Sequence, residues 1–319
     1  MRILLVKTSS LGDVIHNLPV ASDIRRCFPE ANIDWLVEES FAEIPRLHPA
    51  IHQVIPVAMR RWRKSLLSRT AWREVGQFRR LVGADFYDAV IDTQGLIKSA
   101  LLAAQARGPK FGQDARSARE PLAARFYDRR FAIARRQNAV QRNRQLAAAA
   151  LGYALDDLPL DYGIAVPALQ ADWLATGPHA VLLTATSRAD KEWPEAHWHA
   201  LGAALNAAGL QCALPGGNAA ERARAARIAG TLQHAVAAPA MNLTELAGLM
   251  AGAALVVGVD TGLVHLAAAL QRPTVAIYGG SDPALTGVLG TAPYRNLGGI
   301  GQTPAPAEVV DAALRLVAA

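Results

Sequence analysis

Short apolar runs alternate with polar turns and helix-forming segments along most of the chain. The runs that have the length of buried strands are 2–7, 32–37, 53–57, 89–92, 179–185, 210–214, 255–259 and 273–278. The segments between and after them predict helices, among them 14–28, 41–47, 70–82, 95–106, 139–151, 195–208, 263–270 and 307–317. Strands that alternate with helices in this way predict an α/β protein with parallel sheets.

The stretch 255–270 brings an apolar strand directly against a helix. Asp260, Thr261 and Gly262 form the turn, and leucines follow at helical spacing. The first N–H groups of a helix have no partner within the helix, and this suits a phosphate group. An ordinary turn in which Asp260 or Thr261 caps the helix explains the pattern equally well.

Two further strands of the second half end in loops that could hold an anion or a sugar hydroxyl. Thr186, Ser187 and Lys191 follow the strand at 179–185, and a glycine pair at 216–217 follows the strand at 210–214. Because the carboxyl ends of parallel strands share one edge of a sheet, these loops are expected to line a common pocket with the turn at 260–262.

A similar strand, polar loop and helix open the chain. The strand at 2–7 leads through a loop at 8–13 to a helix that we expect to begin at residue 14. Asp13 stands where a helix N-cap belongs, so a capping role explains this carboxylate without any chemistry. Its place after a strand also fits a catalytic group, and both readings stay open at this point.

The chain of 319 residues has the length of two domains. The segment 155–167 is the best candidate for a linker, because it is rich in aspartate, proline and glycine. We therefore predict domains at 1–157 and 165–319.

Charge is divided unevenly between the two halves. Residues 1–160 hold 25 Lys and Arg against 16 Asp and Glu, a net charge of +9, whereas residues 161–319 carry a net charge of −3. A basic half is typical of proteins that meet a polyanion, such as nucleic acid, an anionic membrane surface or a phosphorylated substrate.

Cations are densest at 60–64 and at 107–144. A charge run is usually a solvated face, but the run at 60–64 follows a strand, where α/β sheets bind ligands. The arginine-rich segment has few aromatic residues for bases to stack on and shows no nucleic-acid-binding motif, which argues against nucleic acid.

The two cysteines, Cys27 and Cys212, have no metal-type spacing, which favours a reducing compartment. The first residues have too few apolar positions for a signal-peptide core, and the longest weakly polar run, 246–259, is too short to span a bilayer. These observations predict a cytoplasmic protein.

Five motifs occur in one order along the chain: KTSSLGDVIH at 7–16 with Pro19, DTQGLIKS at 92–99, KEWP at 191–194, PGGN at 215–218 and DTGLVHLA at 260–267. Together they resemble the bacterial lipopolysaccharide heptosyltransferases of glycosyltransferase family 9. The resemblance covers nearly the whole chain, and the motifs are weak singly but specific jointly.

The resemblance implies the GT-B fold, with two Rossmann-like domains facing each other across a cleft. It implies an N-terminal domain that binds the acceptor and a C-terminal domain that binds an ADP-sugar. The donor would be ADP-L-glycero-β-D-manno-heptose, and the acceptor the first Kdo of Kdo2-lipid A. An alternative within the family uses the same donor with a heptose as acceptor; the loop after 185 and the cations at 60–64 favour the Kdo acceptor.

The resemblance also implies roles for individual residues. Asp13 would be the general base in a transfer that inverts the anomeric centre. The residues expected to bind the donor are Thr186, Ser187, Lys191, Glu221, Met241, Asp260, Thr261, Gly262 and His265. The residues expected to bind the acceptor are Arg60, Arg63, Lys64 and Arg119, with either Arg142 or Arg144 and Arg142 as our choice.

No metal and no cofactor are expected, because an inverting GT-B enzyme needs none and the sequence shows no ligand cluster. We expect a monomer with no nucleic-acid partner, in peripheral contact with the anionic cytoplasmic face of the inner membrane. A non-catalytic anion-binding protein remains an alternative on charge alone. An NAD-dependent enzyme is disfavoured, because no G-x-G-x-x-G follows the first strand.

Overall fold

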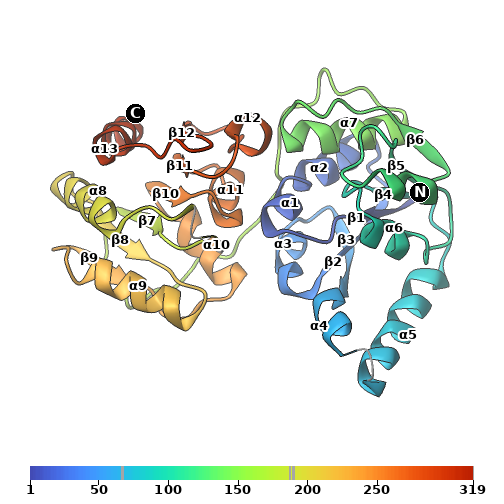
Figure 1. Ribbon diagram of the computed structural model, residues 1–319, viewed down its shortest axis with the longest axis horizontal. Coiled ribbons are helices and arrows are strands. Elements are labelled where there is room, and N and C mark those ends of the chain that lie inside the picture. The colour runs from blue at the N-terminus through green and yellow to red at the C-terminus, as the bar shows by residue number, and fades with distance from the viewer. Residues whose placement is uncertain (66–67, 187, 189–190, 319) are drawn as a thin grey trace. The chain divides into compact units, whose positions relative to one another are not determined.

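The computed structural model describes residues 1–65, 68–186, 188 and 191–318. The chain divides into two compact units, Met1–Ala165 and Val166–Ala319 (Figure 1). Each unit contains a six-stranded sheet in which every pair of neighbouring strands is parallel.

The N-terminal unit has the strand order β3-β2-β1-β4-β5-β6. Its strands are β1 (Arg2–Val6), β2 (Asn32–Glu38), β3 (Ile51–Val57), β4 (Ala89–Asp92), β5 (Lys110–Gln113) and β6 (Arg129–Phe131). Its α-helices are α1 (Leu11–Ile15), α2 (Leu18–Cys27), α3 (Glu43–Arg46), α4 (Met59–Lys64), α5 (Arg69–Ala84), α6 (Ile97–Ala103) and α7 (Ala139–Leu151), with short 3₁₀ helices η1 (Glu39–Phe41) and η2 (Pro121–Phe126).

The C-terminal unit has the order β12-β11-β10-β7-β8-β9. Its strands are β7 (His179–Leu183), β8 (Gln211–Leu214), β9 (Ala235–Ala237), β10 (Leu255–Val259), β11 (Thr274–Tyr278) and β12 (Tyr294–Gly298). Its helices are α8 (Glu195–Ala207), α9 (Ala219–Ala229), α10 (Leu243–Ala251), α11 (Gly262–Ala269), α12 (Pro283–Thr286) and α13 (Pro306–Val317).

Both strand orders are those of a Rossmann-like sheet, so the predicted α/β class is confirmed. In such a sheet the chain winds outward in both directions from a central pair of strands. The first crossovers on either side of that pair leave a crevice at its carboxyl ends, and this switch point is where ligands bind. The central pair is β1 and β4 in the N-terminal unit and β7 and β10 in the C-terminal unit.

Four short strands, β5, β6, β9 and β12, were not among the predicted ones. They lie toward the outer edges of the two sheets and are three to five residues long. The sequence of β6 is arginine, arginine and phenylalanine; both arginines are exposed and the phenylalanine is partly buried. Edge strands of this kind lack the apolar run by which buried strands are recognised.

The helix predicted at 14–28 is instead two helices, α1 and α2. Pro19 is the second residue of α2, a position at which proline is tolerated because its missing N–H would have no partner in the helix. The helix predicted at 41–47 is likewise divided into η1 and α3.

The segment before the division at Ala165 packs against the N-terminal unit. The backbone N–H of Ala165 donates to the carbonyl of Leu47, and the Arg26 guanidinium pairs with Asp161 at 2.8 Å. Gly163 has a φ of +62°, and a Cβ there would lie 2.3 Å from His48 Nε2. Only glycine fits this approach, so the chain is fixed as it leaves the unit.

Candidate functional site

The loop between β1 and α1 carries Asp13 at the switch point of the N-terminal unit. Of the two readings left open for Asp13, the N-cap is wrong, because Ser10 is the N-cap and Asp13 is the third residue of α1. Asp13 Oδ2 accepts hydrogen bonds from the Ser10 backbone N–H at 2.8 Å and from the Ser10 hydroxyl at 3.1 Å. The carboxylate is thus oriented by a capping box and stays half-exposed.

Gln94 holds this loop from the other strand of the central pair. Its Oε1 accepts from the Thr8 N–H at 2.7 Å, the Thr8 hydroxyl at 3.0 Å and the Ser9 N–H at 3.2 Å, and its Nε2 donates to the Ser9 carbonyl. Lys98 adds a hydrogen bond from Nζ to Ser9 Oγ at 2.9 Å. Sequence reasoning gave Gln94 and Lys98 no role, although both lie in the motif at 92–99.

Asp92 fixes the turn that carries Gln94. This fully buried carboxylate accepts from the Gln94 and Gly95 N–H groups and from the hydroxyls of Ser99 and Tyr127. Burial raises the pKa of Asp92, and these four donors oppose the increase. The motif at 92–99 is therefore a rigid support for the Asp13 loop.

Lys7 brings positive charge beneath the same loop. Its ammonium group is buried and donates to the Thr93 carbonyl at 2.8 Å and to Asn143 Oδ1 at 3.2 Å. Desolvation lowers the pKa of Lys7, while the charges of Asp13 and Asp92 act to raise it. Lys7 thus lies within electrostatic range of Asp13.

Arg119 and Arg142 belong to this group of charges. Both lower the pKa of Lys7, and desolvation lowers the pKa of Arg142 while Asp13 acts to raise it. Arg142 approaches the Gln113 amide and the Ser117 carbonyl at 3.5 and 3.4 Å. The structure therefore brings together Asp13, Arg119 and Arg142.

Arg144, the alternative to Arg142, is engaged in the interior. Its guanidinium is 5% exposed, forms a bidentate ion pair with Asp23 at 2.7 and 2.9 Å and donates to the Leu158 carbonyl. The Arg144 guanidinium thus holds α7 against α2 and against the segment that contains Leu158, near the end of the N-terminal unit. This geometry favours Arg142 over Arg144 as a ligand-binding residue.

The cations Arg60, Arg63 and Lys64 lie on α4, which follows the edge strand β3. All three are exposed, and the Arg60 guanidinium lies over the Phe41 ring, 5.2 Å from its centre. β3 lies two positions from β1 in the sheet, and β1 is the strand that leads to Asp13. At the usual spacing between strands, β3 and β1 are about 10 Å apart. No contact with Asp13 is recorded for them within the described part of the chain.

Asp260 is the centre of a polar cluster at the switch point of the C-terminal unit. Its Oδ2 accepts from Lys191 Nζ at 2.5 Å and from the Ser281 hydroxyl, and its Oδ1 lies 4.0 Å from His265 Nε2. Asp260 and His265 are buried, and the Lys191 side chain is 16% exposed. The structure brings together three predicted donor-binding residues and adds Ser281.

Trp193 anchors the loop that carries Lys191. Its ring is fully buried and packs edge-to-face on Trp198, with ring centres 5.0 Å apart, and its Nε1 donates to the Pro304 carbonyl at 3.1 Å. The motif KEWP at 191–194 thus places a lysine next to an aromatic anchor in the core.

Thr261 is the N-cap of α11, and Gly262 is the first residue of this helix. The Thr261 hydroxyl is buried and has no hydrogen-bond partner among the described residues. The same holds for the hydroxyl of Thr184, which follows β7, the strand beside β10. A helix start and two buried hydroxyls at neighbouring strand ends suit a phosphate-bearing ligand.

The other predicted donor-binding residues lie in neighbouring loops. Glu221, in the first turn of α9, accepts from the Gly217 N–H and from Asn218 Nδ2, each at 2.8 Å. Met241 lies between β9 and α10, and Thr186 Oγ1 accepts from the Arg188 N–H at 3.4 Å. Ser187 lies outside the described residues.

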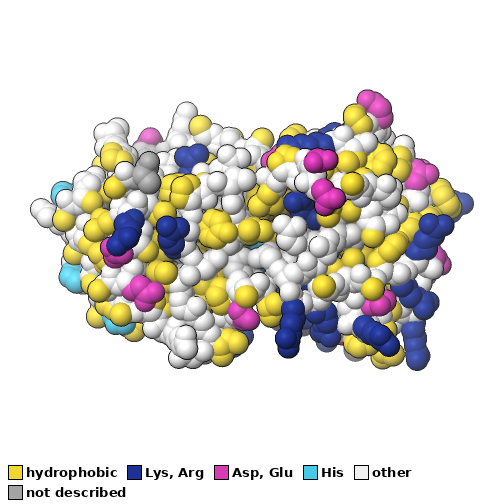
Figure 2. Space-filling view, turned by 90° about the horizontal axis from the view of Figure 1, so that it is seen from above, with side chains coloured by type: hydrophobic (Ala, Val, Ile, Leu, Met, Phe, Trp, Pro, Cys, Tyr) yellow, Lys and Arg dark blue, Asp and Glu magenta, His cyan; other side chains and the backbone are white. Residues whose placement is uncertain are grey.

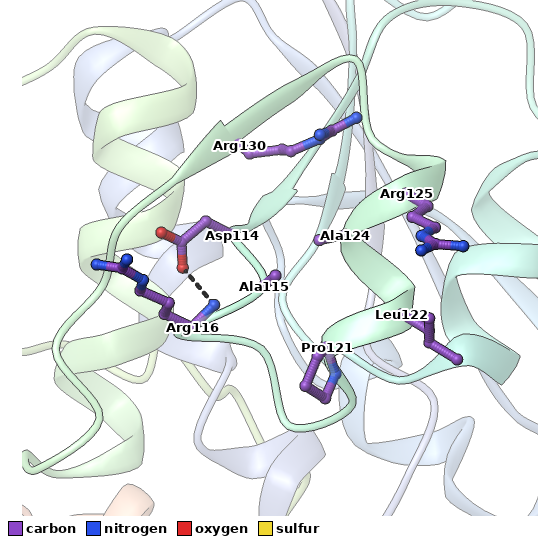
Figure 3. A pocket seen from close by; sticks show the side chains of 8 residues that line it. All are labelled: Asp114, Ala115, Arg116, Pro121, Leu122, Ala124, Arg125 and Arg130. Atoms are coloured by element: carbon purple, nitrogen blue, oxygen red, sulfur yellow. Dashed lines mark hydrogen bonds between the residues drawn. The ribbon is translucent and has the colours of Figure 1, made fainter.

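A hollow of about 560 Å³ opens beside β5 and η2 in the arginine-rich segment (Figure 3). Arg116, Arg125 and Arg130 line it, but Figure 3 shows their guanidinium groups lying apart rather than around one point. The Asp114 carboxylate accepts hydrogen bonds from the backbone N–H groups of Arg116 and Ser117. None of the predicted acceptor-binding residues lines this hollow.

Among the described residues, no group of three or more His, Cys, Asp or Glu side chains could hold a metal ion. Within the same residues, the helices are all too short or too polar to cross a membrane.

Two Rossmann-like units, each with a polar cluster at its switch point, fit the GT-B class of glycosyltransferases, to which the next structure belongs. A structure of E. coli heptosyltransferase WaaC with ADP is similar over 98% of this chain and 98% of that chain, with a TM-score of 0.90 and 44% identity. A structure of E. coli ADP-heptose lps heptosyltransferase II has a TM-score of 0.75 at 23% identity and shares the fold; it covers 100% of this chain and 99% of that chain.

Comparisons of sequence identify the family. The model of glycosyltransferase family 9 (heptosyltransferase) matches residues 75–306. Lipopolysaccharide heptosyltransferase 1 of Salmonella typhimurium is 47% identical over 95% of this chain and 98% of the relative, and that of Pseudomonas aeruginosa is 50% identical over 91% and 82%. The chain belongs to glycosyltransferase family 9.

Proposed function

We propose that this protein transfers L-glycero-D-manno-heptose from ADP-heptose to the first Kdo of Kdo2-lipid A, in synthesis of the lipopolysaccharide inner core. One observation carries the proposal: Asp13 is a half-exposed carboxylate, fixed by Ser10 at the switch point of a unit whose nearby cations suit an anionic acceptor. The names of its relatives in family 9 support the same reaction.

In the proposed reaction, Asp13 takes the proton of the acceptor hydroxyl as the hydroxyl oxygen attacks the anomeric carbon of the heptose. The bond from that carbon to the ADP oxygen breaks on the opposite face, so the configuration inverts. The capping box orients the carboxylate before the acceptor arrives, which lowers the cost of reaching the reactive geometry.

The C-terminal cluster would stabilise the departing ADP. Lys191 supplies a positive charge, and the N–H groups at the start of α11 with the Thr261 hydroxyl supply hydrogen bonds to a diphosphate. Asp260 holds the Lys191 ammonium at the carboxyl end of the sheet. The Glu221 carboxylate would accept hydrogen bonds from the ribose hydroxyls, and Met241 would lie against adenine. We also assign Thr186, Ser187 and His265 to the donor.

The acceptor would meet Arg119 and Arg142 near Asp13, and Arg60, Arg63 and Lys64 near α4. Figure 2 shows Lys and Arg side chains gathered on the N-terminal unit, at the right of the view. We further propose that the protein is a monomer that reaches its lipid-anchored acceptor by charge-driven contact with the cytoplasmic face of the inner membrane. Vesicle binding that is wholly insensitive to salt would contradict a contribution from charge.

The test is product formation with two acceptors. The protein is incubated with ADP-heptose and either Kdo2-lipid A or the same lipid already carrying one heptose. The products are identified by mass spectrometry. We expect one heptose on Kdo2-lipid A and none on the heptosylated lipid. Transfer only to the heptosylated lipid would assign the activity of heptosyltransferase II instead, and transfer to neither would reject the proposed reaction.

A further inference from the structure

A second hollow, of about 260 Å³, opens between α4, α5 and α6 in the N-terminal unit. Its lining is mainly apolar, with Met59 and Trp62 from α4, Val75 and Phe78 from α5, and Leu102 from α6. Figure 1 shows α4 and α5 beside each other at the lower edge of this unit. None of the residues assigned to the donor or the acceptor lines the hollow.

The walls of this hollow are fixed. Trp62 Nε1 donates to Glu74 Oε2 at 2.6 Å, and the Arg61 guanidinium pairs with the same carboxylate at 2.8 Å, which ties α4 to α5. Trp62 and Phe78 belong to the buried core of the unit, and their ring centres lie 6.3 Å apart. The hollow is therefore an opening in a packed apolar wall.

The rim carries positive charge and an exposed apolar side chain. Arg79 and Lys98 line the hollow, as does Leu101, which is 47% exposed. Trp72, one turn before Val75 on α5, is 64% exposed. An apolar hollow with cations at its mouth is complementary to a lipid that has an apolar acyl chain and a phosphate in its headgroup.

Further cations lie on α5, on the side of this helix that faces away from the hollow. Arg69, Arg73 and Arg80 are exposed and share one face of this helix, because their spacing of four and seven residues follows the helical period. Within the described part of the chain, these three arginines and Arg79 form no ion pair. Of these, Arg79 lines the hollow and is available to a lipid phosphate there, whereas Arg61 is neutralised by Glu39 and Glu74.

We propose that the hollow between α4, α5 and α6 binds one acyl chain of an anionic phospholipid of the membrane. Arg79 and Lys98 hold the phosphate of its headgroup, and Trp72 and Leu101 enter the interface between headgroups and chains. Nucleic acid is disfavoured as the partner, because the site presents an open apolar hollow rather than a row of stacking faces.

This inference rests on the membrane contact in the proposed function and not on the transfer reaction. Lys98 also donates to Ser9 in the loop that carries Asp13, so a lipid held at the rim is coupled to that loop by one side chain. The site would position the enzyme on the bilayer that contains its acceptor.

The test uses the quenching of tryptophan fluorescence by short-chain phosphatidylglycerol brominated on its acyl chains, without donor or acceptor. The full-length Trp72→Phe variant is used as background; of its five remaining tryptophans, Trp62 is the one that lines the hollow, and the quenching lost on a further Trp62→Phe substitution reports binding there. We expect saturable quenching by brominated phosphatidylglycerol and much weaker quenching by the matching phosphatidylcholine. Equal quenching by the two lipids would overturn the role of the headgroup, and no quenching would overturn the site.

Leu101→Asp places a negative charge at the mouth and is expected to weaken phosphatidylglycerol binding roughly ten-fold. The matched control is Leu122→Asp, which changes another exposed leucine of the same unit, 53% exposed at the hollow beside η2, and is expected to bind as the parent does. Equal binding by both variants would contradict the proposal, as would a site filled by Kdo2-lipid A but not by phosphatidylglycerol.

Transfer to a deacylated acceptor is measured in parallel. If Leu101→Asp loses lipid binding but retains transfer, the lipid site is supported separately from catalysis.

Discussion

Gln94 provides the sharpest test of how the Asp13 loop is built. The Gln94→Leu substitution keeps the volume of this side chain, which is 8% exposed, but removes its amide. Three backbone groups of the loop lose their partner: the N–H groups of Thr8 and Ser9 and the carbonyl of Ser9. The loop then has to shift to recover hydrogen bonds from water or from neighbouring groups.

The size of the effect follows from these contacts. A buried polar group that loses its partner costs about 1–3 kcal/mol, and partial hydration reduces the total for three groups to about 2–4 kcal/mol. A displacement of the loop by about 1 Å moves Asp13 off its line to the acceptor hydroxyl and costs about 100-fold in rate. We therefore expect kcat to fall about 100-fold while ADP-heptose binding stays within two-fold (~0.4 kcal/mol).

The assay is steady-state transfer to Kdo2-lipid A, with donor affinity measured separately by calorimetry. Gln94→Glu keeps an acceptor for the Thr8 and Ser9 N–H groups and should retain more activity than the leucine variant. Gln137→Leu is the matched control, because within the described part of the chain this amide bonds to Ala134 and Gln145 and not to the loop. A folded Gln94→Leu variant with kcat near that of the parent would refute this account of the loop.

Three further outcomes follow from the described contacts. Arg144→Met leaves the buried Asp23 carboxylate without its cation and should lower the free energy of unfolding by about 3–5 kcal/mol, with little change in the KM for the acceptor. Arg142→Met should instead raise that KM without a comparable loss of stability to denaturant. Lys191→Met removes a charged donor from the proposed diphosphate site and should weaken ADP binding by about 1.5–3 kcal/mol, as read by calorimetry. Burial lowers the pKa of His48 from 6.5 to about 4, so the folded state favours the neutral ring. The stability that His48 contributes is present above pH 6.5 and is lost as the pH falls toward 4, by up to about 3 kcal/mol; urea unfolding of the parent and His48→Gln should show this slope in the parent and a flatter one in the variant.

The sequence was sufficient for the central strands and for the loops that follow them. β1, β4, β7 and β10 are continuous apolar runs because they are buried on both faces, and the polar residues after them mark the carboxyl edge of each sheet. The outer strands were missed because side chains such as those of β6 are largely exposed and carry no apolar pattern. The order of the strands in each sheet could not be predicted from the sequence either, because it depends on pairing between segments that are far apart in the chain.

The supporting residues of the site were harder to predict than the charged ones. Asp13 and Lys191 stand out by charge and position, but Gln94, Ser281 and Thr184 act through contacts with loops that are far away in sequence. The choice between Arg142 and Arg144 likewise depends on which side chain pairs with Asp23. Two arginines separated by one residue in a helix look alike in the sequence until the position of α2 is known.

The most direct test of the account is the Asp13→Asn substitution. Asparagine keeps the size of the side chain and an oxygen that can accept from the Ser10 N–H, but it cannot take the proton of the acceptor hydroxyl. Heptose transfer to Kdo2-lipid A and ADP-heptose binding are measured on the same preparation. We expect a loss of at least about 1,000-fold in kcat with donor affinity unchanged. Transfer at a rate near that of the parent enzyme would contradict it.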